Sequence, residues 1–202
     1  MNIYWIGGSP CAGKSTVAEI LSQRYGLYYF KVDDFLDEYT NRGATKGYPI
    51  CKKQKEMSWE QIWMREPELQ CEEEFAFYAE IFAFVLEDIK QIHNVKGIIT
   101  EGAAYVPKLM KLSGISKDRY LSITPTAEFQ IFHYRKREFV PYILESCEDK
   151  ESAFRNWMNR DILFAEEVRR QCREEEYFSI TNSEEIDIAR LVSIVTAHFG
   201  LE

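Results

Sequence analysis

Short apolar runs alternate along the chain with longer segments in which apolar residues recur at helical spacing. The first apolar run covers residues 2–6, and a helical pattern follows over about 14–24. Gly26 stands directly after this pattern, at a position where glycine commonly ends a helix. The pattern therefore predicts a strand, a loop and a helix, in that order, at the start of the chain.

The same alternation continues through the rest of the sequence. Further strands are predicted at about 27–32, 97–100, 119–123 and 177–180. Further helices are predicted at about 68–93, 105–112, 124–138, 151–174 and 183–199. One more helix is expected to begin after Ser58, because Gln61 stands where a capping box requires it.

Two segments show neither the apolar runs typical of strands nor the helical spacing of apolar residues. They are predicted as loops. Residues 40–55 are polar and hold Gly43, Gly47 and Pro49, which are common in turns. Residues 139–150 form the second segment.

Strands that alternate with helices predict an α/β fold, with a parallel sheet covered by helices on both faces. A length of 202 residues favours one domain. In such folds the ligand crevice lies at the carboxyl ends of the strands. Four polar residues come at or just after predicted strand ends: Ser15, Asp33, Asp34 and Glu101. We therefore expect them to lie along one crevice.

The loop after the first predicted strand carries the most specific signal. Residues 8–15 read Gly-Ser-Pro-Cys-Ala-Gly-Lys-Ser, which fits the G-x-x-x-x-G-K-[ST] pattern of a phosphate-binding loop. Glycines let such a loop point successive N–H groups at one anion, beside the positive end of the following helix. An ordinary glycine-rich turn would not need the Gly-Lys-Ser ending. The expected nucleotide contacts are Gly8, Ser9, Pro10, Cys11, Ala12, Gly13, Lys14, Ser15 and Thr16.

Two side chains of this loop have expected chemical roles. Lys14 supplies a mobile positive charge for the β- and γ-phosphates, which makes it a candidate catalytic residue. The hydroxyl group of Ser15 is the candidate Mg²⁺ ligand.

Acidic residues follow two other predicted strands and are candidate catalytic groups. Asp33 and Asp34 end the second strand, where a carboxylate can accept a proton from a substrate hydroxyl, or hold that hydroxyl or Mg²⁺ in place. The alternative is that the pair caps a helix. Alternation places the two on opposite faces and leaves open which one points inward. Glu101 is expected to hold a Mg²⁺-bound water or to contact the acceptor.

Four arginines follow in the second half of the chain, where a mobile segment at about 126–172 could deliver them to a transferring phosphoryl group. They are Arg135, Arg137, Arg155 and Arg160. The alternative is ordinary surface ion pairing, which contributes about 0–1 kcal/mol per pair.

Asn182 follows the last predicted strand and is a candidate contact for the adenine edge of a nucleotide. A turn and helix cap is an equal alternative at this position. The aromatic residues that follow Asp33-Asp34, such as Trp59, Trp63 and Phe77, are expected mainly in packing, and a few of them could line an acceptor pocket.

Composition narrows the class of function. The formal net charge of −8 disfavours a broad nucleic-acid surface, which needs clustered Lys and Arg. The apolar runs are too short to span a bilayer and no secretory signal stands out, so a cytoplasmic location is expected. Five scattered cysteines without a C-x-x-C pair predict neither a zinc site nor a redox motif. Cys11 could be oxidisable, although a small residue filling the loop is the simpler interpretation.

Together these motifs resemble the P-loop kinases of the nucleoside-monophosphate-kinase-like group, which includes shikimate kinase, gluconate kinase and chloramphenicol phosphotransferase. The resemblance rests on residues 8–16, Asp33-Asp34, the Ile-Thr-Glu-Gly string at 99–102 and the arginines placed as in a lid. It implies a five-stranded parallel sheet of order 2-3-1-4-5, ATP with Mg²⁺, and a lid that closes over both substrates.

The resemblance extends over nearly the whole chain. It implies one P-loop kinase-like domain over 1–202, with an acceptor-binding helical region at about 34–94 and a lid at about 126–172. The stretch 41–93 is longer and more aromatic than in the smallest members, and the lid lacks a familiar zinc-binding cysteine set.

The expected function is an ATP-dependent phosphotransferase that acts on a small-molecule acceptor, most simply at a hydroxyl group. A rival of another class is a nucleotide-binding regulatory ATPase or switch that acts through a protein partner. The Asn-Lys-x-Asp string that often marks guanine specificity is absent from the sequence. A nucleic-acid kinase is disfavoured by the acidic net charge.

Overall fold

Five parallel strands form one sheet in the computed structural model, which describes residues 1–201. The strands are β1 (Asn2–Gly8), β2 (Tyr28–Lys31), β3 (Gly97–Glu101), β4 (Tyr120–Pro125) and β5 (Phe178–Asn182). Their order is β2-β3-β1-β4-β5. The α/β class and the 2-3-1-4-5 order are confirmed. Glu202, the last residue of the expected domain, lies outside the described residues.

Alternating side chains of the strands build two separate cores, one on each face of the sheet. In β1, Trp5 enters the core on one face, whereas Tyr4 and Ile6 enter the core on the other. In β3, Ile98 and Ile99 divide in the same way. This alternation follows from the period of two in a strand, and it requires helices over both faces.

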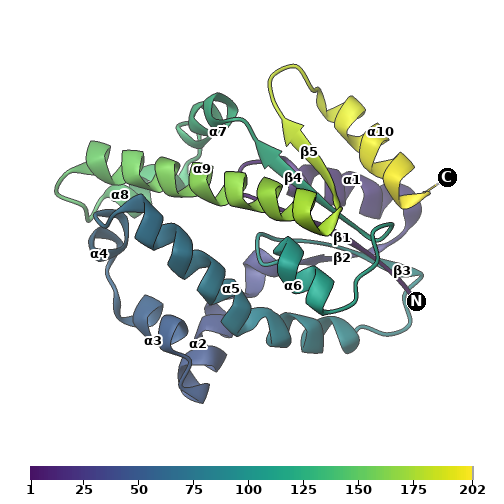
Figure 1. Ribbon diagram of the computed structural model, residues 1–202, viewed down its shortest axis with the longest axis horizontal. Helices are drawn as coiled ribbons and strands as arrows, with labels where there is room; N and C mark the ends of the chain where they lie inside the picture. The colour runs from purple at the N-terminus through teal and green to yellow at the C-terminus, as the bar shows by residue number, and fades with distance from the viewer. Residues whose placement is uncertain (202) are drawn as a thin grey trace.

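The helices cover the two faces as the pattern predicts (Figure 1). Helices α1 (Lys14–Tyr25) and α10 (Ile188–Phe199) pack together on one face. The other face is covered by α5 (Pro67–Lys90), α6 (Pro107–Leu112) and α9 (Lys150–Glu175). Gly26 ends α1 with a φ of 65°. None of the helices within residues 1–201 is both long and apolar enough to cross a membrane.

The prediction of a loop over residues 40–55 is wrong. A short 3-10 helix, η1 (Val32–Phe35), follows β2 and leads into α2 (Leu36–Lys46) and α3 (Pro49–Glu56). Gly47 ends α2 with a φ of 88°, and Pro49 occupies the first turn of α3. Glycine and proline therefore mark the ends of two helices here instead of a continuous loop.

Gly43 lies in the middle of α2 because a neighbouring helix approaches closely. A Cβ at this position would overlap the sulfur of Cys51 in α3 and lie 2.9 Å from the Cβ of Cys51. The glycine thus lets α2 and α3 pack backbone to side chain, and sequence periodicity alone does not reveal this contact.

Gly43→Ala is expected to destabilise the protein by about 1–3 kcal/mol, because an inserted methyl group must displace α3. Thr45→Ala, an exposed change in the same helix, is the control and should be close to neutral. Denaturant unfolding followed by circular dichroism measures both. Equal stability of the two variants would show that α2 and α3 can move apart without any loss of folding free energy.

The segment between β4 and α9 also differs from its prediction. The helix expected at 124–138 is shorter, α7 (Ala127–Tyr134), and the loop expected at 139–150 contains α8 (Phe139–Leu144). Val140 and Leu144 are buried at helical spacing, and Pro141 is tolerated in the first turn of α8. These short helices pack with α4 (Trp59–Trp63) on α9 around a third, smaller core.

Two helix starts are set by capping side chains. The capping box of Ser58 and Gln61 is confirmed at the start of α4. Helix α10 begins at Ile188, later than the expected 183, because the Asp187 side chain accepts a hydrogen bond from the Arg190 amide.

Candidate active site

A loop with glycine at both turns connects β1 to α1. Gly8 and Gly13 have φ angles of 119° and 88°, in the left-handed region that glycine adopts most easily. A Cβ on Gly8 would overlap the Ile123 carbonyl oxygen of β4. Cys11 also has a positive φ, 60°. Such backbone strain persists where the surroundings enforce it and is typical of binding sites.

Lys14 is the first residue of α1, and its side chain folds back over this loop. The residue is 6% exposed, and Nζ donates a hydrogen bond to the Ser9 carbonyl oxygen at 2.7 Å. The Ser9 hydroxyl is buried without a partner among the described residues. A buried ammonium group beside a neutral acceptor favours the approach of an anion.

Glu101 ends β3 and reaches the first turn of α1. Its Oε1 accepts hydrogen bonds from Ser15 Oγ and from the Tyr29 hydroxyl, both at 2.9 Å. Burial and the Glu101 carboxylate raise the pKa of Tyr29, so the phenol stays protonated and donates. The residue is 1% exposed, and its Oε2 has no hydrogen-bond partner within residues 1–201.

This donor set fits Mg²⁺, which prefers oxygen ligands and usually binds proteins through one or two of them. Ser15 supplies a hydroxyl group and Glu101 a carboxylate with one oxygen left over. In the part of the chain that the structure describes, no group of three or more acidic, His or Cys side chains could hold a metal. A bound ion would therefore complete its shell with water and phosphate oxygens.

Asp33 and Asp34 lie in η1 and differ in surroundings. Asp34 is exposed, and its Oδ1 lies 3.4 Å from Lys31 Nζ. Asp33 is also exposed at the surface, but the protein around it lowers its solvation and raises its pKa. The Lys14 ammonium group opposes this rise, and the Glu101 carboxylate adds to it. Of the two, Asp33 is therefore the aspartate whose charge interacts with Lys14 and Glu101.

The four predicted arginines do not gather at one point. The Arg137 Nη2 lies 3.8 Å from the sulfur of Cys11 in the phosphate loop. Arg135 is exposed and lies 3.8 Å from Glu151. Arg155 is exposed and donates to the hydroxyl of a serine at the start of α9.

Arg160 is the buried member of the four. Its Nη1 lies 2.6 Å from Glu74 Oε2, and its Nε lies 2.6 Å from Asp161 Oδ1. The guanidinium carbon lies 5.1 Å from the centre of the Trp63 ring. Burial raises the pKa of Asp161 to about 6 although Arg160 opposes the rise. This network joins α5 to α9.

A cavity of 430 Å³ opens beside the phosphate loop, at the end of β5. Phe129, His133 and Arg137 line one side of it, from α7 and the turn that follows. Asn182 lines it from β5, and its Nδ2 donates to the Ala12 carbonyl oxygen at 3.1 Å. The buried Asn182 Oδ1 has no partner among the residues that the structure describes. The size and position of this cavity suit a planar base attached to a polyphosphate.

A second cavity, of 890 Å³, lies among the helices that follow Asp33. It is lined from α2, α3, α4, α5 and α9, and its lining includes Trp59, Trp63 and Arg160. Tyr78 also lines it, and the carboxylates of Glu74 and Asp33 add to the rise that burial causes in the Tyr78 pKa. This cavity therefore lies within electrostatic reach of Asp33.

Comparison with known proteins supports the fold assignment. A shikimate kinase from Acinetobacter baumannii, solved in complex with shikimate, matches at a TM-score of 0.50 and 17% identity, over 100% of this chain and 95% of that one. A Thermus thermophilus protein matches at a TM-score of 0.50 and 17% identity, over 100% of this chain and 98% of the other. The chain has the P-loop kinase fold. No protein-family model and no curated protein sequence matches it.

Within this P-loop kinase fold, three side chains near the site escaped sequence reasoning. Tyr29 lies inside a strand, where the sheet register pairs it with Ile99, and its hydroxyl group reaches Glu101 two residues further along β3. Glu74 belongs to an acidic run that reads as a solvated helix face. Phe129 lies on a helix whose apolar spacing signals packing. None of the three carries a motif, so tertiary contacts alone identify them.

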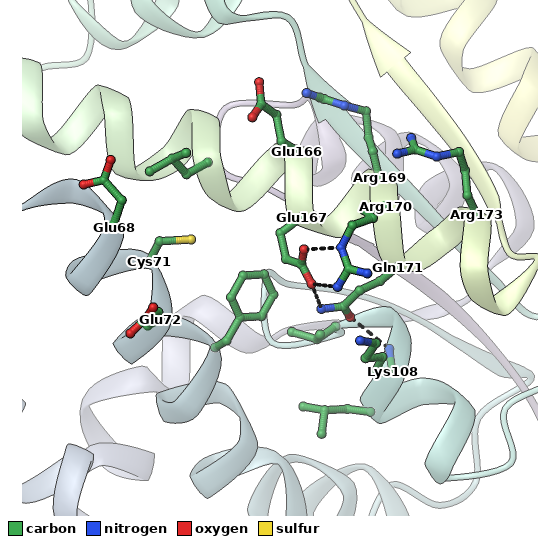
Figure 2. A pocket seen from close by; sticks show the side chains of 14 residues that line it. Glu68, Cys71, Glu72, Lys108, Glu166, Glu167, Arg169, Arg170, Gln171 and Arg173 are labelled. Carbon is green, nitrogen blue, oxygen red and sulfur yellow. Dashed lines mark hydrogen bonds and ion pairs between the residues drawn. The ribbon is translucent and has the colours of Figure 1, made fainter.

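A further groove of this P-loop kinase fold lies elsewhere. It measures 960 Å³ and runs between α5, α6 and α9, and no residue of the phosphate loop lines it (Figure 2). Arg170 pairs with Glu167 in its wall, and the uncharged Gln171 donates to Glu167 and accepts from the Lys108 amide. Volume alone therefore does not identify the site.

Proposed function

We propose that the protein transfers the γ-phosphoryl group of ATP to a hydroxyl group of a small molecule. The observation that carries the proposal is the hydrogen bond between Ser15 and Glu101, which places a buried carboxylate next to the phosphate loop and the Lys14 ammonium group. Phosphoryl transfer depends chiefly on positioning and charge stabilisation, and these groups supply both.

The nucleotide is held by the chain's own donors. Backbone N–H groups of residues 8–16 and the N-terminus of α1 bind the phosphates, and Lys14 binds the β- and γ-phosphate oxygens. The cavity beside Asn182 receives the base. Arg137 lies at the mouth of the loop and contributes charge to the phosphates.

Ser15 and Glu101 would hold Mg²⁺, Ser15 directly and Glu101 either directly or through a water molecule. When bound, Mg²⁺ neutralises charge on the phosphate oxygens. Asp33 orients the acceptor hydroxyl and takes its proton as the oxygen attacks phosphorus. Residues 34–94 bind the acceptor, and residues 126–172 act as the lid that carries the arginines. Arg160 contacts the acceptor side, whereas Arg135 and Arg155 reach phosphate only if the lid closes.

The decisive experiment is an ATP-consumption assay over a panel of nucleosides, sugars, aminoglycosides and other alcohols, with product identification by mass spectrometry. A kinase consumes ATP in proportion to an added acceptor and yields its phosphate ester. A regulatory switch binds nucleotide, hydrolyses it slowly and ignores every acceptor. Stoichiometric ester formation from one panel member supports the proposal, and hydrolysis independent of all of them refutes it.

Tyr29→Phe is expected to raise the Mg²⁺ concentration for half-maximal activity by about tenfold, because Glu101 loses one of the two groups that orient it. Maximal activity at saturating Mg²⁺ should change much less. Tyr28→Phe, the exposed neighbour in β2, is the matched control. A Mg²⁺ titration of activity separates the two effects. Identical titrations for both variants would exclude a positioning role for Tyr29.

A further inference from the structure

The buried and half-buried cations around the cavity of α2, α3, α4, α5 and α9 are already paired with carboxylates. Arg160 lies 2.6 Å from Glu74. Arg65 Nη1 lies 2.5 Å from Glu73 Oε2, and Lys53 Nζ lies 2.5 Å from Glu73 Oε1. Each guanidinium group is thus occupied by a protein carboxylate on α5.

The other charged lining groups balance each other. Asp37 and Lys55 are exposed to solvent and have opposite signs. The charged side chains that line the cavity are three carboxylates and three cations: Asp37, Glu73, Glu74, Lys55, Arg65 and Arg160. Its wall is therefore electrically neutral in composition, and its less exposed charges are satisfied internally.

The rest of the wall is aromatic and apolar. The Trp59 ring stacks on Trp63 with ring centres 6.4 Å apart and planes 8° apart, and 44% of Trp59 remains exposed. Met57, Ile62 and Phe77 add further apolar surface. Such a wall gains free energy by covering an apolar skeleton.

Two uncharged polar side chains in the wall keep hydrogen-bonding capacity. Gln70 donates through Nε2 to the Arg65 carbonyl oxygen at 2.8 Å, while its Oε1 is buried and unpartnered within residues 1–201. Trp63 Nε1 is likewise buried without an acceptor in the described part of the chain. A small shift of either side chain offers a neutral donor or acceptor to a ligand.

We propose that the acceptor is an uncharged alcohol with a sizeable apolar or aromatic skeleton. This inference rests on the proposed phosphoryl transfer. An anionic acceptor would have to displace Glu73 or Glu74 from its arginine, and the displaced carboxylate would lose its partner. A cationic acceptor would meet carboxylates that are already neutralised. The volume of 890 Å³ lies within the range of about 300–1,000 Å³ that is usual for drug-sized ligands.

Three probes of one shape test the charge preference. The first is a benzene ring with two hydroxymethyl groups in para positions. The other two replace one hydroxymethyl group with a carboxylate or with an aminomethyl group. Dissociation constants from ligand-observed NMR titrations of the full chain give the preference without any need for turnover. The uncharged diol should bind at least about tenfold tighter than either charged probe.

Glu73→Gln provides the sharper comparison, because it frees Arg65 and Lys53 while keeping the shape of the side chain. Affinity for the carboxylate probe should rise by about tenfold, and affinity for the diol should hold. Glu74→Gln leaves Arg160 paired with Asp161 and should give a smaller rise. Glu72→Gln, an exposed change on the same helix that lines the other groove, is the matched control and should change nothing.

Tighter binding of the carboxylate or of the amine to the unaltered protein would overturn the proposal. So would the absence of binding by all three probes, or a Glu73→Gln variant that binds the carboxylate no better. Calorimetry with Mg²⁺·ADP, measured separately, reports on the phosphate loop. If the unaltered protein does not bind ADP, the proposed kinase function is refuted. If it binds ADP but prefers a charged probe to the diol, only the proposed acceptor class is refuted.

Discussion

Lys14→Ala is expected to lower kcat/KM for ATP-dependent phosphorylation by about 10³-fold or more, while the protein remains folded. The Lys14 ammonium group is buried over the phosphate loop with only a carbonyl oxygen as its hydrogen-bond acceptor in the described residues. Its charge is therefore available to phosphate oxygens, on which charge develops during transfer. Removing it leaves the backbone donors in place but takes away the positive charge nearest to them.

The folded state should tolerate this change, because the apo protein keeps Lys14 buried at a desolvation cost. Thermal unfolding should therefore shift little in the absence of nucleotide. ADP, however, should protect the unaltered protein from unfolding more than it protects the variant. Lys111→Ala, on the surface of α6, is the control for loss of a lysine. Undiminished turnover by Lys14→Ala would remove the central element of the proposed mechanism.

Much of the fold was predictable because its signals are local. The short apolar runs of β1 and β3 follow from burial on both faces of the sheet, and the helical spacing of apolar residues in α1 and α9 follows from burial of one stripe of each helix. The order of the strands came from the resemblance to P-loop kinases and is confirmed. The parallel arrangement followed from the alternation of strands with helices.

The errors lie where glycine and proline have helical roles. Gly43 allows α2 and α3 to approach, Gly47 ends the first of these helices, and Pro49 begins the second. In sequence the three look like a loop, since each favours turns when considered alone. The contact between Gly43 and Cys51 that reverses this interpretation is tertiary and has no local signal.

The candidate site likewise has one part with a local sequence signal and another part that depends on tertiary contacts. The phosphate loop is recognisable because one short stretch supplies most of its donors. The choice between Asp33 and Asp34 was open, because it depends on the turn of η1, which breaks the alternation of the strand. The partners of Glu101 and Arg160 lie 72 and 86 residues away in sequence, in Tyr29 and Glu74. Such pairs are invisible until the sheet and helices assemble.

Asp33→Asn is expected to lower kcat by about 10²–10⁴-fold with little change in ATP affinity, because the proposed role of Asp33 concerns the acceptor hydroxyl. Asp34→Asn is the matched control. It should retain nearly full activity, since the Asp34 carboxylate pairs with Lys31 and has no role in the proposed mechanism. Steady-state kinetics with calorimetric measurement of ATP binding separates the two parameters. Equal effects of both substitutions would contradict the assignment of Asp33 as the aspartate that orients the acceptor hydroxyl.

The raised pKa of Asp33 adds a second test. In the proposed mechanism the ionised form of Asp33 takes the proton, so activity should fall with decreasing pH, and the midpoint should lie above the value of about 4 for a free aspartate. The effect of pH on the free energy of unfolding has the opposite sign. A carboxyl group whose pKa is higher in the folded state favours folding below its unfolded pKa, and this contribution is lost as pH rises through the folded pKa. At neutral pH the unaltered protein therefore bears the cost of the ionised group, and Asp33→Asn should be at least as stable while nearly inactive. A variant that loses activity together with stability would indicate a structural role for Asp33 instead.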